Sequence, residues 1–97
     1  MTEEKLLNKL SSIVHSLREL NGLAPKVISP DDTPFNERGG LDSLNALEAE
    51  ADLAETLGVS ADSEILAPLR NPELKLREVA KLIAKKTGAG NGDRNGE

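Results

Sequence analysis

Aliphatic residues repeat every three or four positions near the start of the chain, and this repeat constrains the fold more than any other feature. Between Thr2 and Asn21 it comprises Leu6, Leu7, Leu10, Ile13, Val14, Leu17 and Leu20. Such spacing places apolar side chains on one face of an α-helix, which Thr2 can cap and Asn21-Gly22 ends. Val and Ile are few, and no clear run of alternating residues indicates a strand. The sequence therefore predicts an all-α fold.

Two more helices and one short helical segment are expected after a long connection. Residues 22–41 contain Pro25, Pro30, Pro34 and three glycines, which interrupt regular structure. A second helix is predicted to begin at Asp42 or Ser43 and to stop at Gly58, a short segment to follow at about 62–69, and a last helix to be capped by Asn71 and closed by Gly88. We expect a small four-helix bundle over residues 1–87 and a disordered tail over the polar, glycine-rich residues 88–97.

The buried faces can be predicted from the same spacing. In the second helix the expected stripe is Leu44, Leu47, Ala51 and Ala54, with Leu53 and Leu57 beside it. In the last helix the inner face is predicted to be Leu76, Val79, Ala80 and Ile83. The long connection is itself apolar at Leu23, Val27, Ile28, Phe35 and Leu41, and it is therefore expected to lie against the bundle.

Several classes of function are disfavoured by composition. The chain has no Cys, which excludes disulfides, thiolate metal sites and a Cys nucleophile. Its single histidine, His15, is expected on the exposed side of the first helix and argues against a His-based metal cluster or catalytic triad. The N-terminus is neither basic nor followed by a long apolar run, so neither a signal peptide nor a membrane span is expected and a cytoplasmic protein is the default.

The charge is unevenly distributed along the chain. The net charge is −5, and residues 39–69 contain seven acidic residues and no Lys or Arg. Nucleic acid is a poor candidate partner, because binding to phosphates requires a basic surface. A partner with a basic surface is the better expectation.

Ser43 lies in the triplet Asp42-Ser43-Leu44 at the expected start of the second helix. An ordinary helix N-cap would explain a Ser or an Asp at this position. Asp42 already offers a capping side chain, however, and neither Asn45 nor Ala46 is the Glu or Gln of a capping box. Unpaired N–H groups and the positive end of the helix dipole favour a phosphate diester there. With no general base in sequence reach, we interpret Ser43 as an attachment point.

An acidic arc follows on the same helix. At about 100° per residue, Glu48, Asp52 and Glu55 share one narrow arc, while Glu50 points elsewhere. Like charges four residues apart cost a helix roughly 0.2–0.5 kcal/mol per pair, and this helix has no Lys or Arg to offset them. The arc is either a solvated face kept for solubility or a docking strip for basic surfaces, and its place just after Ser43 favours docking.

The stretch "GGLDSLNALEAEADLAETLGV" resembles the acyl carrier protein family, and the helix order and long first loop extend the resemblance over residues 3–87. The resemblance implies that Ser43 accepts a 4′-phosphopantetheine arm from coenzyme A, delivered by a separate Mg²⁺-dependent phosphopantetheinyl transferase, with Asp42 and Leu44 as the flanking motif. The terminal thiol of the arm would carry acyl groups as thioesters.

By the same resemblance the chain would be a monomeric, non-catalytic carrier in fatty-acid, lipid or polyketide-type biosynthesis. Its Glu48, Asp52 and Glu55 would dock on basic patches of the enzymes that load and process the cargo.

Some residues depart from that family. Asn45 stands where fatty-acid carriers usually have an acidic residue, and Glu50-Ala51 where they carry bulky apolar residues, so a specialised free-standing carrier fits best. The small residues Ala46, Ala49, Ala51 and Ala54 either change how a cargo chain is sheltered or merely permit close helix packing. Two alternatives remain: an aminoacyl or peptidyl carrier of the D-alanyl type, and an unmodified acidic adaptor for a basic partner.

Overall fold

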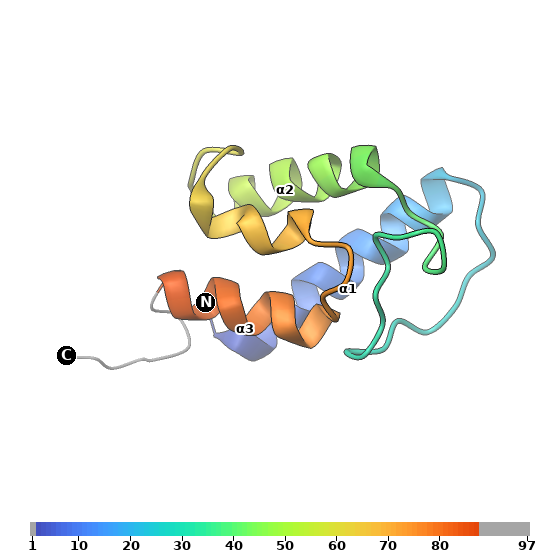
Figure 1. Ribbon diagram of the computed structural model, residues 1–97, viewed down its shortest axis with the longest axis horizontal. Helices are drawn as coiled ribbons and strands as arrows, with labels where there is room; N and C mark the ends of the chain where they lie inside the picture. The colour runs from blue at the N-terminus through green and yellow to red at the C-terminus, as the bar shows by residue number, and fades with distance from the viewer. Residues whose placement is uncertain (1, 88–97) are drawn as a thin grey trace.

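The computed structural model describes residues 2–87, and every regular element in that part of the chain is helical. The order is α1 (Glu3–Leu20), α2 (Ser43–Leu57), the 3₁₀-helix η1 (Glu64–Arg70) and α3 (Leu76–Thr87) (Figure 1). This confirms the predicted all-α, four-helix fold with a long first loop. The tail predicted at 88–97 lies outside the described residues.

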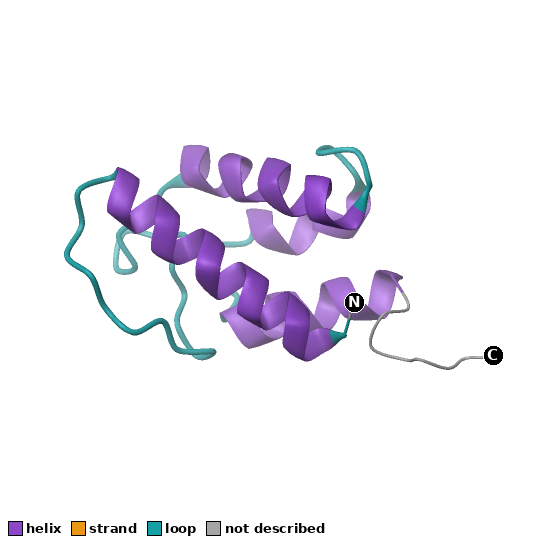
Figure 2. Cartoon of the chain, turned by 180° about the vertical axis from the view of Figure 1, so that it is seen from behind, coloured by secondary structure: helices purple, strands orange, loops and turns teal. Residues whose placement is uncertain are grey.

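α1 holds the bundle together. It runs diagonally across the molecule and packs against both α2 and α3, as the view from behind shows (Figure 2). The short η1 packs against α2 and α3 on the opposite side, whereas the backbones of α2 and α3 do not come close to each other within residues 2–87. α2 therefore has two different neighbours, the long α1 and the short η1.

The first helix agrees with its predicted ends. The Thr2 side chain accepts a hydrogen bond from the Lys5 N–H (3.2 Å), and the Asn21 N–H donates to the Leu17 carbonyl (3.0 Å). Leu20 was predicted on the buried face, but it is 77% exposed because the buried stripe ends at Leu17. His15 is exposed, as expected.

The apolar core is a single cluster to which every helix contributes, and much of it lies between α1 and α3. Fully or almost fully buried residues of these two helices include Leu6, Leu10, Ile13, Val14, Leu76, Val79, Ala80 and Ile83. Those from α3 are the four residues that the spacing predicted. Removing such side chains from water is the largest favourable term in folding, at roughly 25 cal/mol per Å² of apolar surface.

The predicted inner face of α2 is wrong at its N-terminal half. Leu44 and Leu47 are 68% and 56% exposed, and Ala51 is also exposed. The buried residues of this helix are Asn45, Ala46, Ala49, Glu50, Leu53 and Ala54. Small side chains let α1 and η1 approach α2 closely, so Ala46, Ala49 and Ala54 face inward beside Leu53. Ala54 and Leu53 were predicted correctly.

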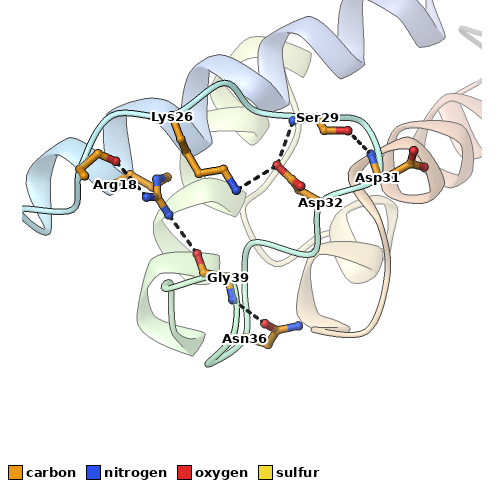
Figure 3. A network of polar contacts seen from close by, with 8 residues as sticks. Arg18, Lys26, Ser29, Asp31, Asp32, Asn36 and Gly39 are labelled. Atoms are coloured by element: carbon orange, nitrogen blue, oxygen red, sulfur yellow. Dashed lines mark hydrogen bonds and ion pairs between the residues drawn. The ribbon is translucent and has the colours of Figure 1, made fainter.

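The long loop is held to the bundle by polar contacts (Figure 3). The Arg18 guanidinium donates to the Gly39 carbonyl (3.1 Å) and to the Ala24 carbonyl (2.9 Å). Further along, the Asp32 carboxylate accepts from the Ser29 N–H (2.9 Å) and lies 3.6 Å from the Lys26 ammonium. These bonds fix a segment that has no helix or strand of its own.

The apolar residues of this loop differ in how far they are buried. Phe35 and Leu41 are buried, and Leu23 and Ile28 pack partly against the core, as predicted. Val27 is the exception, with 90% of its surface exposed. The loop therefore contacts the bundle mainly through its two ends and its middle at Phe35.

The last helix begins later than predicted. Asn71 was expected to cap it, but Asn71 instead stabilises a preceding turn, in which its side chain accepts from the Glu73 N–H (3.0 Å). α3 starts at Leu76, because the loop carbonyls of Asp32 and Pro30 accept from the N–H groups of Leu76 (3.0 Å) and Arg77 (2.9 Å). These tertiary contacts act together with a local one, in which the Glu78 carboxylate accepts from the Lys75 N–H (2.9 Å).

The short segment predicted at 62–69 is η1, shifted by one to two residues. The Ser63 hydroxyl accepts from the Ile65 N–H (3.2 Å) and caps it, and Leu66, Pro68 and Leu69 are buried. No helix among residues 2–87 is both long and apolar enough to cross a membrane.

Candidate functional site

Ser43 is the first residue of α2, and it is exposed. Asp42 is the N-cap, as expected, and its carboxylate accepts from the Asn45 N–H (3.0 Å). The sequence was expected to lack a capping box, and that expectation is wrong: the Asn45 side-chain oxygen accepts from the Asp42 N–H (3.1 Å) and completes one. An Asn amide oxygen fills the place that Glu or Gln usually takes. The Ser43 hydroxyl is therefore not needed to cap the helix.

The backbone beside Ser43 has two free donors. Within residues 2–87, the N–H groups of Ser43 and Leu44 have no hydrogen-bond partner, whereas the Asn45 and Ala46 N–H groups are bound by Asp42. Free donors and the positive end of the helix dipole both favour a negatively charged group at this position. A phosphodiester on the Ser43 oxygen fits this environment.

Asn45 joins the start of α2 to the end of α1. It is only 8% exposed, and its side-chain oxygen also accepts from the Asn21 side-chain amide (3.1 Å). Its own amide donates to the Glu48 carboxylate (3.1 Å). An acidic residue here could not make that last donation. The sequence showed the departure from the usual acidic residue but did not reveal this network.

The turn before Ser43 requires a glycine. A Cβ on Gly39 would lie 2.3 Å from the Thr33 carbonyl oxygen and 2.5 Å from the Pro34 Cα, both backbone atoms that cannot rotate away. The Gly39 N–H also donates to the Asn36 side chain (2.8 Å), and the Leu41 N–H to the Pro34 carbonyl (3.1 Å). The approach to Ser43 is thus fixed by close backbone packing.

The three acidic residues of the predicted docking strip are all exposed. Their charge is partly offset within the chain, because the Lys9 ammonium of α1 lies 3.8 Å from the Asp52 carboxylate. Glu48 accepts the hydrogen bond from Asn45, and among the described residues Glu55 has no ion-pair partner. The sequence indicated that the positive charge missing from this helix would come from a partner, and Lys9 of α1 corrects that expectation for Asp52.

Two exposed leucines lie to one side of these acids. At about 100° per residue, Leu44 is next to Glu55, and Leu47 lies between Leu44 and the side of the helix that carries Ser43. We call Leu44, Leu47, Glu48, Ala51, Asp52 and Glu55 the outer face of α2. This face combines apolar and acidic side chains next to Ser43.

A cavity of about 320 Å³ lies beside Ser43, between α2, η1 and the loop. It is lined by Phe35, Ser43, Ala46, Leu47, Glu50, Leu69, Arg70 and Pro72. Most of these side chains are apolar, and the volume is at the small end of the range for ligand pockets, roughly 300–1,000 Å³. Ala46 leaves room that a larger residue at the same position would fill.

Glu50 is the polar feature of that cavity. As predicted, it points away from the acidic arc, and its side chain is only 3% exposed. One carboxylate oxygen, Oε1, accepts from the Arg70 Nε (3.1 Å), whereas the buried Oε2 has no hydrogen-bond partner. The sequence could not pair Glu50 with Arg70, because the two lie twenty residues apart and on different elements.

Comparison with known proteins agrees with this geometry. The family model described as "phosphopantetheine attachment site" matches residues 11–75, which include α2, the cavity and the loop. The chain therefore belongs to the phosphopantetheine-binding carrier family, as its resemblance to acyl carrier proteins implied. No curated protein and no solved structure gives a significant match.

Family membership fixes the cofactor and the general role. Carriers of this family hold a covalently attached 4′-phosphopantetheine, and they interact with phosphopantetheinyl transferases and acyl-processing enzymes. The carrier domains of this family are themselves non-catalytic.

Proposed function

We propose that this protein is a non-catalytic acyl carrier whose 4′-phosphopantetheine is attached to Ser43. The observation that carries the proposal is an exposed serine at the first position of α2, with Asp42 capping the helix in its place and two unpaired N–H groups alongside. A serine that is exposed and not used for capping is free to form a phosphodiester. The other residue of the flanking motif, Leu44, is exposed and available to an enzyme that recognises the turn.

The chemistry needs no catalytic group from this chain. The Ser43 oxygen forms a bond to phosphorus while the pyrophosphate bond of coenzyme A breaks, the 3′-phospho-AMP portion leaves, and the serine proton passes to the transferase. The N–H groups of Ser43 and Leu44 then face the phosphodiester and stabilise its charge. The thiol of the arm supplies the thioester on which an acyl group is held.

The outer face of α2 is the surface on which partner enzymes would dock. Glu48, Asp52 and Glu55 favour a basic partner, and the exposed Leu44 and Leu47 offer apolar contact at the same place. Exposed charges in salt solution give contacts that form quickly and release easily, which suits a carrier that visits several enzymes. The enzymes that dock here would belong to fatty-acid, lipid or polyketide-type biosynthesis.

The test is modification in vitro. The purified chain is incubated with coenzyme A, Mg²⁺ and a broad-specificity phosphopantetheinyl transferase, and its intact mass is measured. We expect the parent chain to gain one phosphopantetheine, and Ser43→Ala to gain none. Ser16→Ala is the matched control, because Ser16 is also an exposed helical serine, and it should be modified like the parent. Circular dichroism verifies that each variant is folded.

The same experiment separates the carrier from an unmodified acidic adaptor. An adaptor would show no mass gain in any variant, and its binding to a basic partner would be sensitive to salt but not to Ser43→Ala. Aminoacyl and peptidyl carriers would be modified in the same way as an acyl carrier. They differ in which adenylating or acyl-transfer enzyme loads the thiol.

A further inference from the structure

The cavity beside Ser43 contains an ionic group that a simple apolar pocket would lack. Two polar residues are buried among residues 2–87, Asn45 and Glu50, and both lie on α2 within two turns of Ser43. The network around Asn45 accounts for its burial. Glu50 has a different position, because it lines the cavity and only one of its two oxygens is hydrogen-bonded.

Stability does not explain a glutamate at this position. A buried ion pair seldom stabilises a fold more than well-packed apolar residues of similar volume, because both charges lose their hydration. Arg70, whose side chain is 41% exposed, neutralises the charge of Glu50 but leaves Oε2 without a donor. A buried carboxylate oxygen without a donor is costly, and a ligand that supplies one is correspondingly favoured.

The position of Glu50 relative to Ser43 places it within reach of a bound cargo. The two residues are seven apart on α2, which is about 10 Å along the helix axis, and they lie on the same side of the helix. Ser43 lines one end of the cavity, and Glu50 with Arg70 lines another part. A group carried on an arm at Ser43 can therefore enter the cavity and meet the Glu50 carboxylate.

We propose that this cavity selects short acyl groups that carry a neutral hydrogen-bond donor, such as a hydroxyl, and disfavours saturated acyl chains. The inference rests on the proposed attachment at Ser43. A saturated chain in the cavity would leave Oε2 without any donor, whereas a hydroxyl that reaches the carboxylate would donate to it. An ammonium group would add a second positive charge beside the already neutral Glu50–Arg70 pair, so an aminoacyl cargo is the poorer fit.

The test compares acyl groups of matched length on the intact chain. The transferase is given hexanoyl-, 3-hydroxyhexanoyl- or 3-aminohexanoyl-coenzyme A in place of coenzyme A, and the melting temperature of each product is measured. We expect the 3-hydroxyhexanoyl form to melt about 4–8 °C above the hexanoyl form. Amide hydrogen exchange in residues 46–50 and 69–72 should also be slowest in the hydroxyacyl form.

Variants show whether Glu50 is responsible. In Glu50→Leu the preference should reverse, with the hexanoyl form the more stable. In Glu19→Leu, which changes an exposed glutamate of α1 away from the docking face and the cavity, the preference of the parent should persist. The comparison within the parent chain needs no variant, so it stays decisive even if Glu50→Leu folds poorly.

The outcomes separate this inference from the proposed function. If the chain takes up no acyl-phosphopantetheine, attachment at Ser43 is wrong. If all three groups are attached but the hexanoyl form melts as high as the hydroxyacyl form, the carrier function stands and the selectivity is wrong. A 3-aminohexanoyl form that is the most stable of the three would also overturn the choice of a neutral donor.

Discussion

The two sides of the bundle are built differently. Between α1 and α3, large aliphatic side chains are fully buried, and Leu6, Leu10, Leu76 and Ile83 have no measurable exposure. Between α2 and η1, Leu53, Leu66 and Leu69 are as deeply buried, but α2 also turns three alanines and a glutamate inward, and a cavity of about 320 Å³ remains. Dense packing on one side gives stability, and loose packing on the other leaves room beside Ser43. Under the proposed function, the α2–η1 side is the one that would receive cargo.

The largest expected effect comes from a substitution in the core between α1 and α3. Leu10→Ala should lower the free energy of unfolding by about 2–5 kcal/mol, because it removes a fully buried side chain and leaves a cavity. Leu47→Ala, on the outer face of α2, should change it by less than about 0.5 kcal/mol, since Leu47 is 56% exposed. Urea unfolding of both variants measures the difference. Equal losses would mean that the buried Leu10 contributes no more to stability than the exposed Leu47.

The next test concerns the ion pair on the loose side. Arg70→Ala should cost about 1–3 kcal/mol, because it leaves the buried Glu50 carboxylate unpaired. Glu50→Leu removes the buried charge and should change the stability by less than about 1 kcal/mol. The two variants are compared by urea unfolding under the same conditions. A larger loss in Glu50→Leu than in Arg70→Ala would show that the pair is a major source of stability on this side.

A smaller effect is expected from the polar contacts where the start of α2 meets the end of α1. Asn45→Ala should cost about 1–2 kcal/mol, because the Asp42 N–H and the Asn21 amide both lose their acceptor. Asn21→Ala breaks only the link to α1 and should cost less. Thermal unfolding followed by circular dichroism compares the two. An equal loss in both would locate the contribution of Asn45 in the α1 contact rather than in the cap.

The smallest effect concerns the turn that leads from α2 to η1. A hydrogen bond from the Ser60 hydroxyl, then a backbone hydrogen bond, lowers the pKa of the Asp62 carboxyl below its ordinary value of 3.8. Because the pKa of Asp62 is lower in the folded state than in the unfolded state, this carboxylate stabilises the fold at pH values above its ordinary pKa. That stabilisation is lost as the pH falls through the lowered pKa of the folded state. At neutral pH the parent should therefore melt at a slightly higher temperature than Asp62→Asn, and in acid the two melting temperatures should converge. A difference that stays constant in acid would contradict this.

Features set by local sequence were predictable. The ends of α1 and α2 follow from Thr2, Asn21, Asp42 and Gly58, whose capping roles depend only on neighbouring residues. The inner face of α3 was predicted for the same reason. The inner face of α2 was predicted correctly only at Leu53 and Ala54, because Leu44 and Leu47 also recur at helical spacing and yet are exposed. The spacing of Ala46, Ala49, Leu53 and Ala54 follows the helical repeat and could have revealed it.

Features that depend on distant parts of the chain could not be predicted. The start of α3 is set by carbonyl groups of Pro30 and Asp32 in the long loop, and the burial of Glu50 depends on η1 and Arg70. Of the candidate site, the exposed Ser43 and its cap were predictable from the residues themselves. The cavity was not, since it forms only when the loop, α2 and η1 come together.

The most direct test of the central claim locates the modification. After reaction with coenzyme A and the transferase, the chain is digested and its peptides are sequenced by fragmentation mass spectrometry. A single phosphopantetheine on Ser43 is the result that we predict. A phosphopantetheine on another serine, or none on any peptide, would contradict the claim that the start of α2 and the cavity beside it form a carrier site.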